Sequence, residues 1–237
     1  MDPLAQVIRQ QLHLGRLLPL GGPADGAWIA ESAARAVLEG ATAAIRGARV
    51  DSVRLALADP DTAAEPVVPG PPSALPPAPL RVTAECAAAT DEPLPAVVGR
   101  LRSVLAIAAH GLGLVVEAVD LRITDLVAPG ELTARTPAPG RRVPTVRTDR
   151  GPAARAALAV PGVTRLTGTQ AGTGRAVQMQ ERRSPGALAT RHLRIELATA
   201  AHHNALEVAL AVRRAASAAL PDRPTVAVLV TEVDGLA

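Results

Sequence analysis

The chain has 237 residues, 48% of them hydrophobic, which is enough for one large domain or two of about 110 residues. It has no Phe or Tyr, its one aromatic residue is Trp28, and all 25 basic residues are Arg, a composition that a GC-rich genome imposes through its codons. The core must therefore be thin layers of Ala, Val, Leu and Ile, and an aromatic platform for stacking bases is excluded.

Charge is divided unevenly along the chain. Residues 1–126 hold ten Arg and fourteen acidic residues, a net charge of −4, whereas residues 127–237 hold fifteen Arg and eight acidic residues, a net charge of +7. From Arg135 to Arg194 there are twelve Arg against only Asp149 and Glu181. Such a block attracts anionic partners: acidic proteins, lipid headgroups or nucleic acid.

The single cysteine, Cys86, excludes an intramolecular disulfide framework and suits a reducing compartment. The N-terminal residues lack the basic segment and apolar run of a signal peptide. The longest apolar stretch, Val104–Val116, is interrupted by His110 and two glycines and is too short to span a bilayer. We therefore expect a cytoplasmic protein, either free or peripheral to a membrane.

Residues 1–24 form an N-terminal segment with amphipathic character. Between Pro3 and Leu18, Leu4 and Ile8 fall on one side of a helix, and basic residues recur on another. Such a helix could lie at a membrane interface or dock on its own domain. We favour docking, because the basic face is weak.

Residues 31–57 predict an Ala-rich helix that leads into a strand. Pro60–Pro79 is rich in proline, which cannot donate to a sheet ladder, so we expect a loop there. From Leu80 to Cys86 apolar and polar residues alternate, as in a strand with one buried face. Asp91–Pro93 is typical of a helix start, and residues 119–126 predict a closing strand. The helix between them has an apolar stripe formed by Val97, Leu101, Val104, Leu105 and Ala108.

A linker rich in Pro, Gly and Arg, residues 127–150, precedes a second run of elements. Residues 151–169 predict a helix and a strand, and residues 175–183 predict a polar strand. The Gly-rich segment between these two strands, Gly168–Gly174, predicts a hairpin. The chain then repeats the order strand, helix and strand at residues 193–200, 205–220 and 226–233.

The two runs indicate an internal duplication. Leu80–Leu126 and Leu193–Leu236 are each strand–helix–strand, and their closing strands match position for position from Val119 and Val226. Each connection suggests a right-handed crossover between neighbouring or near-neighbouring strands. We predict an α+β fold of two pseudo-repeats, each a small β-sheet with two helices in the order helix–strand(s)–strand–helix–strand. The first repeat covers residues 25–126 with its Pro-rich loop at 60–79, and the second covers residues 151–237.

The sequence resembles the alkaline-shock, envelope-stress-response family of bacterial proteins. The resemblance is carried by AARAALAVPGVTRLTG at Ala153–Gly168, by LRIELATA at Leu193–Ala200, and by the helix and Val-rich strand of Ala205–Val233. In the family pattern a Val-Pro-Gly-Val turn, here residues 160–163, leads from the first helix into a strand. In the first repeat, Arg46–Arg49 replaces this Pro-Gly turn. The resemblance implies a non-enzymatic cytoplasmic protein, tethered near the membrane by partners and associated with envelope stress.

Catalytic and metal-binding patterns are weak. His203 and Glu207 share a helix face, but a second pair of metal ligands is missing nearby, so His202 and His203 are expected to be solvated or capping residues. Gly168–Gly174 lacks the Lys of a phosphate loop. Cys86 lies among alanines on an apolar strand face, where a buried inert thiol is expected. We predict no enzyme, no cofactor and no metal site.

The Arg-rich segment is the candidate site for an anion or a partner. Its residues are Arg141, Arg142, Arg147, Arg150, Arg175, Arg182 and Arg183. Two hypotheses remain. The first is a non-enzymatic adaptor or scaffold that binds a protein partner, which could itself be membrane-anchored, or an anionic membrane surface. The alternative is sequence-nonspecific binding of nucleic acid through residues 135–194.

Overall fold

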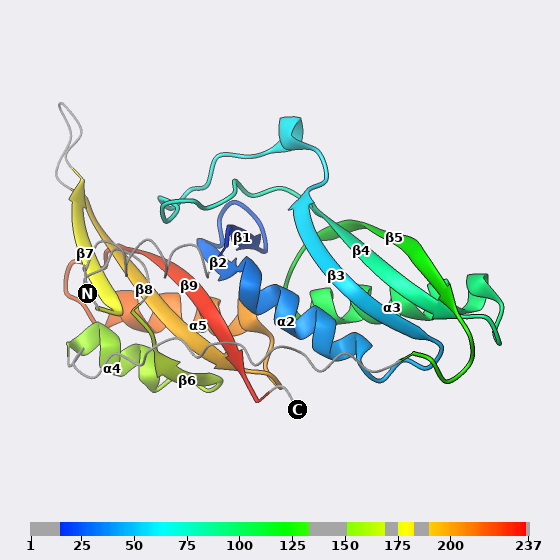
Figure 1. Cartoon of the computed structure of the whole chain (residues 1–237). Helices are drawn as coiled ribbons and strands as arrows, with labels where there is room; N and C mark the ends of the chain where they lie inside the picture. The colour runs from blue at the N-terminus through cyan, green and yellow to red at the C-terminus, as the bar shows by residue number, and fades with distance from the viewer. Residues whose placement is uncertain (1–14, 133–150, 169–174, 183–189, 236–237) are drawn as a thin grey trace, which may run out of the picture.

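The computed structural model describes residues 15–132, 151–168, 175–182 and 190–235. These residues form an α+β protein with two β-sheets, which confirms the predicted class (Figure 1). The elements are β1 (Leu17–Leu20), β2 (Ala27–Ala30), α2 (Glu31–Thr42), β3 (Ala48–Leu57), the 3-10 helix η1 (Pro60–Thr62), β4 (Leu80–Ala89), α3 (Leu94–Leu112), β5 (Val116–Val127), α4 (Pro152–Leu158), β6 (Val163–Leu166), β7 (Val177–Arg182), β8 (Thr190–Ala200), α5 (Ala205–Ala218) and β9 (Thr225–Asp234).

The smaller sheet has the order β3-β4-β5 and carries α2 and α3. β4 is antiparallel to β3 and parallel to β5, to which it is connected through α3. The alternation in β4 buries Leu80, Val82 and Cys86, as its two-residue period predicts. The predicted stripe of α3 is buried at Val97, Leu101 and Leu105.

The larger sheet has the order β1-β2-β9-β8-β6, with β7 also paired to β8. β8 is antiparallel to β6 and β7, and parallel to β9, to which α5 connects it. Alanine forms the helix–sheet contacts that a core nearly free of aromatic residues requires. The buried alanines of α4 and α5 are Ala153, Ala154, Ala157, Ala205, Ala209 and Ala216.

The chain contains two units: the first runs from α2 to β5 and the second from α4 to β9. The two units share the order of their elements, the directions of their strands and the position of a β-bulge. The pairing of β4 with β5 shifts between Cys86 and Ala87, and that of β8 with β9 shifts between Leu197 and Ala198. A threonine is the extra residue in each case. Thr124 Oγ1 donates to Cys86 O at 3.3 Å, and Thr231 Oγ1 donates to Leu197 O at 3.2 Å.

A glycine with a left-handed backbone conformation directly precedes the first strand of each unit. Gly162, in the predicted Val-Pro-Gly-Val turn, has φ +91°, and its carbonyl accepts from Ala200 N at 2.9 Å. Gly47 has φ +75°, and its carbonyl accepts from Ala89 N at 3.0 Å. Although the turn before β3 has no Pro-Gly, Gly47 supplies the backbone conformation that the turn needs.

Two predictions from the sequence were wrong. β6 and β7 both pair with β8, at Thr199–Leu197 and Ile195–Thr190, and the structure does not pair them with each other. β6 and β7 therefore follow one another along the same edge of β8 instead of pairing as the two strands of a hairpin. Residues 169–174, between them, lie outside the described residues. The predicted N-terminal helix was extended too far, because its last residues, Leu17 and Leu18, belong to β1.

The N-terminal strands join a sheet that is distant in the sequence. β2 lies parallel to β9, with Trp28 opposite Leu229, and β1 continues the sheet beyond it. The Pro-rich loop packs over Trp28, whose Nε1–H donates to Leu75 O at 3.3 Å. Residues predicted to lie before or at the start of the first repeat thus complete the sheet of the second unit.

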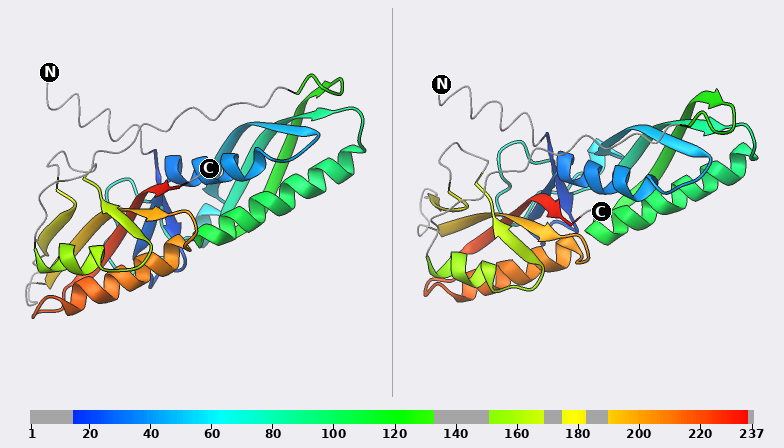
Figure 2. Two further views of the ribbon diagram at one scale, coloured as in Figure 1. Left: turned by 90° about the horizontal axis from the view of Figure 1, so that it is seen from below. Right: turned by 60° about the horizontal axis from the view of Figure 1, so that its bottom comes forward.

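The two units meet where α3 ends and α5 begins. Figure 2 shows the two helices nearly in line, with the C-terminal end of α3 beside the N-terminal end of α5. Asn204, the N-cap of α5, donates from Nδ2 to His110 O at 3.2 Å. Gly113 ends α3 with φ +84° and packs against Leu206, so the junction is close.

Candidate functional site: an open strand edge

The predicted basic site lies largely outside the described chain. Arg141, Arg142, Arg147, Arg150 and Arg183 fall in segments that the structure does not describe, and Arg182 is placed only as the last residue of β7. Arg175 is exposed just before β7. The predicted cluster therefore stays a prediction.

Three other arginines of the basic stretch interact with side chains of their own unit. Arg165 forms ion pairs with Glu232 and Asp234, the latter at 3.1 Å. Arg191 pairs with Asp222 at 2.8 Å. Arg194 donates to Gln178, and its Nε lies 3.9 Å from the buried carboxylate of Glu196. These guanidinium groups are engaged within the fold, so they contribute little free positive charge to a surface.

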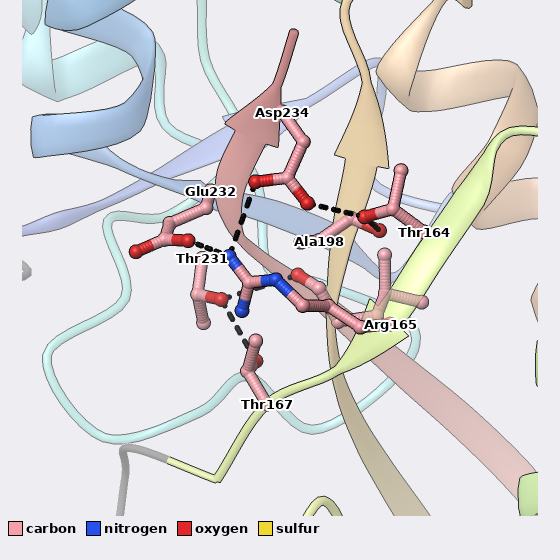
Figure 3. A network of polar contacts seen from close by, with 8 residues as sticks. Thr164, Arg165, Thr167, Ala198, Thr231, Glu232 and Asp234 are labelled. Atoms are coloured by element: carbon pink, nitrogen blue, oxygen red, sulfur yellow. Dashed lines mark hydrogen bonds and ion pairs between the residues drawn. The ribbon is translucent and has the colours of Figure 1, made fainter. Parts of the chain in front are cut away.

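The polar cluster around Arg165 joins β6 to β9 across β8 (Figure 3). Thr164 donates to Asp234 at 2.5 Å, and Thr167 and Thr231 are hydrogen-bonded at 2.8 Å. Because β8 lies between β6 and β9, these contacts connect β6 to β9 across β8, next to the bulge. The arrangement satisfies buried polar groups and stabilises the bulge, as such networks commonly do.

The histidine pair does not assemble a metal centre. The rings of His202 and His203 have centroids 4.5 Å apart just before α5. Within the described part of the chain, no group of three or more His, Cys, Asp or Glu side chains could hold a metal ion. His192 is buried on β8 and shares a hydrogen bond of 2.9 Å with Thr225.

Cys86 is fully buried on β4, and burial raises the pKa of its thiol from 9.0 to about 11. At about pH 8 its thiolate fraction is about 100-fold lower than that of an unperturbed thiol. We expect negligible labelling by a thiol–disulfide exchange reagent in the folded protein, and complete labelling in concentrated guanidinium chloride. Rapid labelling of folded protein would contradict this burial.

The Cys86 thiol also makes stability depend on pH. Because its pKa in the folded protein lies above the unfolded value, the free energy of unfolding should decline as pH rises from 9.0 to about 11.

An open hollow of about 950 Å³ lies beside the start of α3 and the segment after α2. Arg100 donates to both carboxylate oxygens of Glu92, at 2.7 and 2.5 Å, and this hydrogen bonding lowers the pKa of Glu92. The main charges of the wall therefore neutralise each other. The hollow provides shape but little excess charge for holding an ionic ligand.

The outer edge of β5 is the feature best suited to binding. β5 pairs with β4 on one side, and no strand of the described chain pairs with its other side. Its helix-facing apolar residues are half-buried or exposed, and Leu126 is 57% exposed. On β9, the equivalent strand, Val226, Val228 and Val230 are at most 2% exposed. We call this surface the β5 edge: the outer backbone edge of Val119–Ile123 and the apolar stripe Val119, Leu121, Ile123 and Leu126.

A matched pair of arginines marks the edges of β5 and β9. Arg102 is the ninth residue of α3, and its Nε donates to Val119 O at 3.2 Å. Arg213 is the ninth residue of α5, and its Nε donates to Val226 O at 2.9 Å. Val119 and Val226 are the residues at which the two closing strands were aligned by sequence. Each arginine thus reaches the outward carbonyl of the same strand position.

The pair was missed in the sequence because the helices were compared only by their apolar stripes. Aligning Val97 with Val208 and Leu101 with Val212 places Arg102 opposite Arg213. The signal was therefore available, but an arginine on an exposed helix face is ordinarily solvated in a chain this rich in Arg.

Comparisons with family models, curated proteins and solved structures found no match to this chain. None of the helices in the described residues is both long and apolar enough to cross a membrane.

Proposed function

We propose that this chain is a non-enzymatic adaptor or scaffold in the bacterial cytoplasm, built from two duplicated units, that binds a protein partner through the β5 edge. The observation that carries the proposal is the contrast between two equivalent strands. β9 is covered by β2, whereas the outer edge of β5, which lies beside apolar side chains, is paired with no strand of the described residues. Exposed strand edges are recurrent sites of peptide addition.

The shared architecture supports the duplication. The strand directions, the threonine bulge, the left-handed glycine and the helix arginine recur at equivalent places in the two units. Duplication would let one unit keep the sheet closed while the other binds. The resemblance to envelope-stress-response proteins suggests that the partner is anchored at the membrane.

Affinity capture with edge variants tests the proposal. Leu126→Lys places a charge on the apolar stripe at an exposed position, so folding should be unaffected while strand addition is opposed. We expect capture of the wild-type partner from native cells to fall at least about fivefold, as for a residue worth more than 1 kcal/mol of binding energy. Quantitative mass spectrometry of the captured material measures this loss.

Leu158→Lys is the matched control, because Leu158 is 48% exposed on α4 of the other unit. It should leave capture unchanged. Equal capture by wild type and Leu126→Lys would refute binding at the β5 edge.

The alternative proposal is binding of nucleic acid or an anionic membrane through the basic segment. Replacing Arg141, Arg142, Arg182 and Arg183 by Glu should then abolish retardation of DNA or RNA probes, or binding to anionic vesicles, with a steep salt dependence. Under the adaptor proposal this variant retains its protein partner. Loss of the partner in this variant, with full capture by Leu126→Lys, would favour the basic segment as the binding site.

A further inference from the structure

We infer that the β5 edge takes up an extended segment of a partner protein that runs parallel to β5 and is held at its entry by Arg102. This inference rests on the proposed function and specifies its geometry. The chain contains its own template, because the equivalent edge of β9 is already occupied by β2.

In the template, Arg213 fixes the segment where it enters the sheet. Its guanidinium donates to Val226 O of β9 and also to the carbonyls of Ala24 and Asp25, which are separated from β2 only by Gly26. Burial lowers the pKa of Arg213. One side chain thus joins the host strand to the incoming chain at the N-terminal end of both. The contact can lie at the N-terminal end of both strands because β2 runs parallel to β9.

The backbone ladder then continues from the entry point. Val228 N donates to Gly26 O at 3.0 Å, and β2 lies opposite β9 from Ala27–Val228 to Ile29–Val230. The pairing stops just before the bulge at Thr231. The strand-addition site of β9 is therefore a short stretch between the arginine contact and the bulge.

Each part of this site is present on β5. Arg102 holds Val119 O through Nε, and its two terminal nitrogens have no partner among the described residues. Leu121 occupies the place of Val228, so its N–H faces outward, and Ile123 occupies the place of Val230 before the bulge at Thr124. By analogy with Arg213, these terminal nitrogens of Arg102 can donate hydrogen bonds to the carbonyls of an incoming turn.

The side chains along the edge define the chemistry of the occupant. In β2, Ala27 and Ile29 lie opposite Val228 and Val230, so the occupant should place small or apolar residues opposite Leu121 and Ile123. Trp28 lies opposite Leu229, whose equivalent on β5 is Arg122. The Arg122 side chain is 77% exposed and lies 4.0 Å from Glu85, so an acidic residue at this position is favoured.

A peptide of residues 23–32, PADGAWIAES, is the probe, together with its Trp28→Glu form. The isotope-labelled full chain is titrated and its backbone amide resonances are followed by NMR. We expect saturable shifts at Leu121 and Ile123, with tighter binding of the Trp28→Glu peptide. Arg102→Ala should weaken binding about tenfold, the effect of losing hydrogen bonds to a charged group.

Two matched variants control for indirect effects. Arg100→Ala removes a neighbouring arginine of α3 that pairs with Glu92, and it should leave peptide affinity unchanged. In the probe peptide, methylating the backbone nitrogen of Trp28 should abolish binding, because a parallel ladder directs that N–H toward the host strand. Methylating the backbone nitrogen of Ala27 should not.

Arg213→Ala tests the corresponding contact on β9. It should speed hydrogen exchange at the Val228 amide at least about tenfold, since β2 loses its entry contact.

The outcomes separate this inference from the adaptor proposal. Equal peptide binding by wild type and Arg102→Ala, or no shift on β5, would overturn the arginine-held parallel segment even if Leu126→Lys abolishes partner capture. Shifts on β5 that depend on protein concentration without peptide would overturn it as well, because a second copy would then occupy the edge. If Leu126→Lys has no effect on capture, the adaptor proposal itself fails.

Discussion

Trp28→Ala is expected to destabilise the protein by about 3–5 kcal/mol, the usual cost of truncating a large buried aromatic residue. Trp28 is 1% exposed, in a chain without Phe or Tyr to fill the space it would leave. It lies between Leu229 of β9 and the Pro-rich loop, and its Nε1–H donates to Leu75 O. The loss should therefore combine a cavity, an unpaired carbonyl and a loosened loop.

Urea denaturation followed by circular dichroism measures this effect. Two neighbouring valines of the Pro-rich loop provide the matched comparison. Val68→Ala, at a residue only 2% exposed, should be destabilising, whereas Val67→Ala, at a residue 73% exposed, should change little. A Trp28→Ala variant as stable as wild type would show that the loop does not close the core over the sheet.

The sequence predicted elements well wherever one chain segment determines its own periodicity. The alternation from Leu80 to Cys86 and the stripe from Val97 to Leu105 follow from a buried face at short spacing, and both were confirmed. The turn at Gly162 was implied by the family resemblance, whose Val-Pro-Gly-Val segment lies within four consecutive residues. In each case the information lies within a few residues.

The missed features depend on distant partners. β1 and β2 are short and are flanked by glycines. β2 becomes a strand by pairing with β9, about 200 residues further along the chain, and β1 by pairing with β2. A Gly-rich segment separates β6 from β7 in the sequence, and only their pairing with the same edge of β8 shows that they follow one another along it. The open edge of β5 is visible only when the two sheets are compared, so the candidate site emerged from the structure.

Gly113→Ala is the second variant with a large expected effect. Gly113 has φ +84°, a conformation that costs an alanine about 1–2 kcal/mol. An added Cβ would also lie less than 3.0 Å from Leu206 Cβ, so α3 and α5 would have to move apart. Overpacking of this kind costs about 1–3 kcal/mol. We expect a total destabilisation of about 2–5 kcal/mol in urea denaturation.

Gly111 provides the control within the same helix. Added to Gly111, a Cβ would meet nothing within 4 Å, and the residue has ordinary helical geometry. Gly111→Ala should therefore stabilise α3 by about 0.5–1 kcal/mol, opposite in sign to Gly113→Ala two residues later. Because the carbonyl of Gly113 also accepts a hydrogen bond from Gly21 N at 3.0 Å, its displacement should disturb the N-terminal strands as well. Similar stabilities for the two alanine variants would mean that the units are not held in contact at this junction.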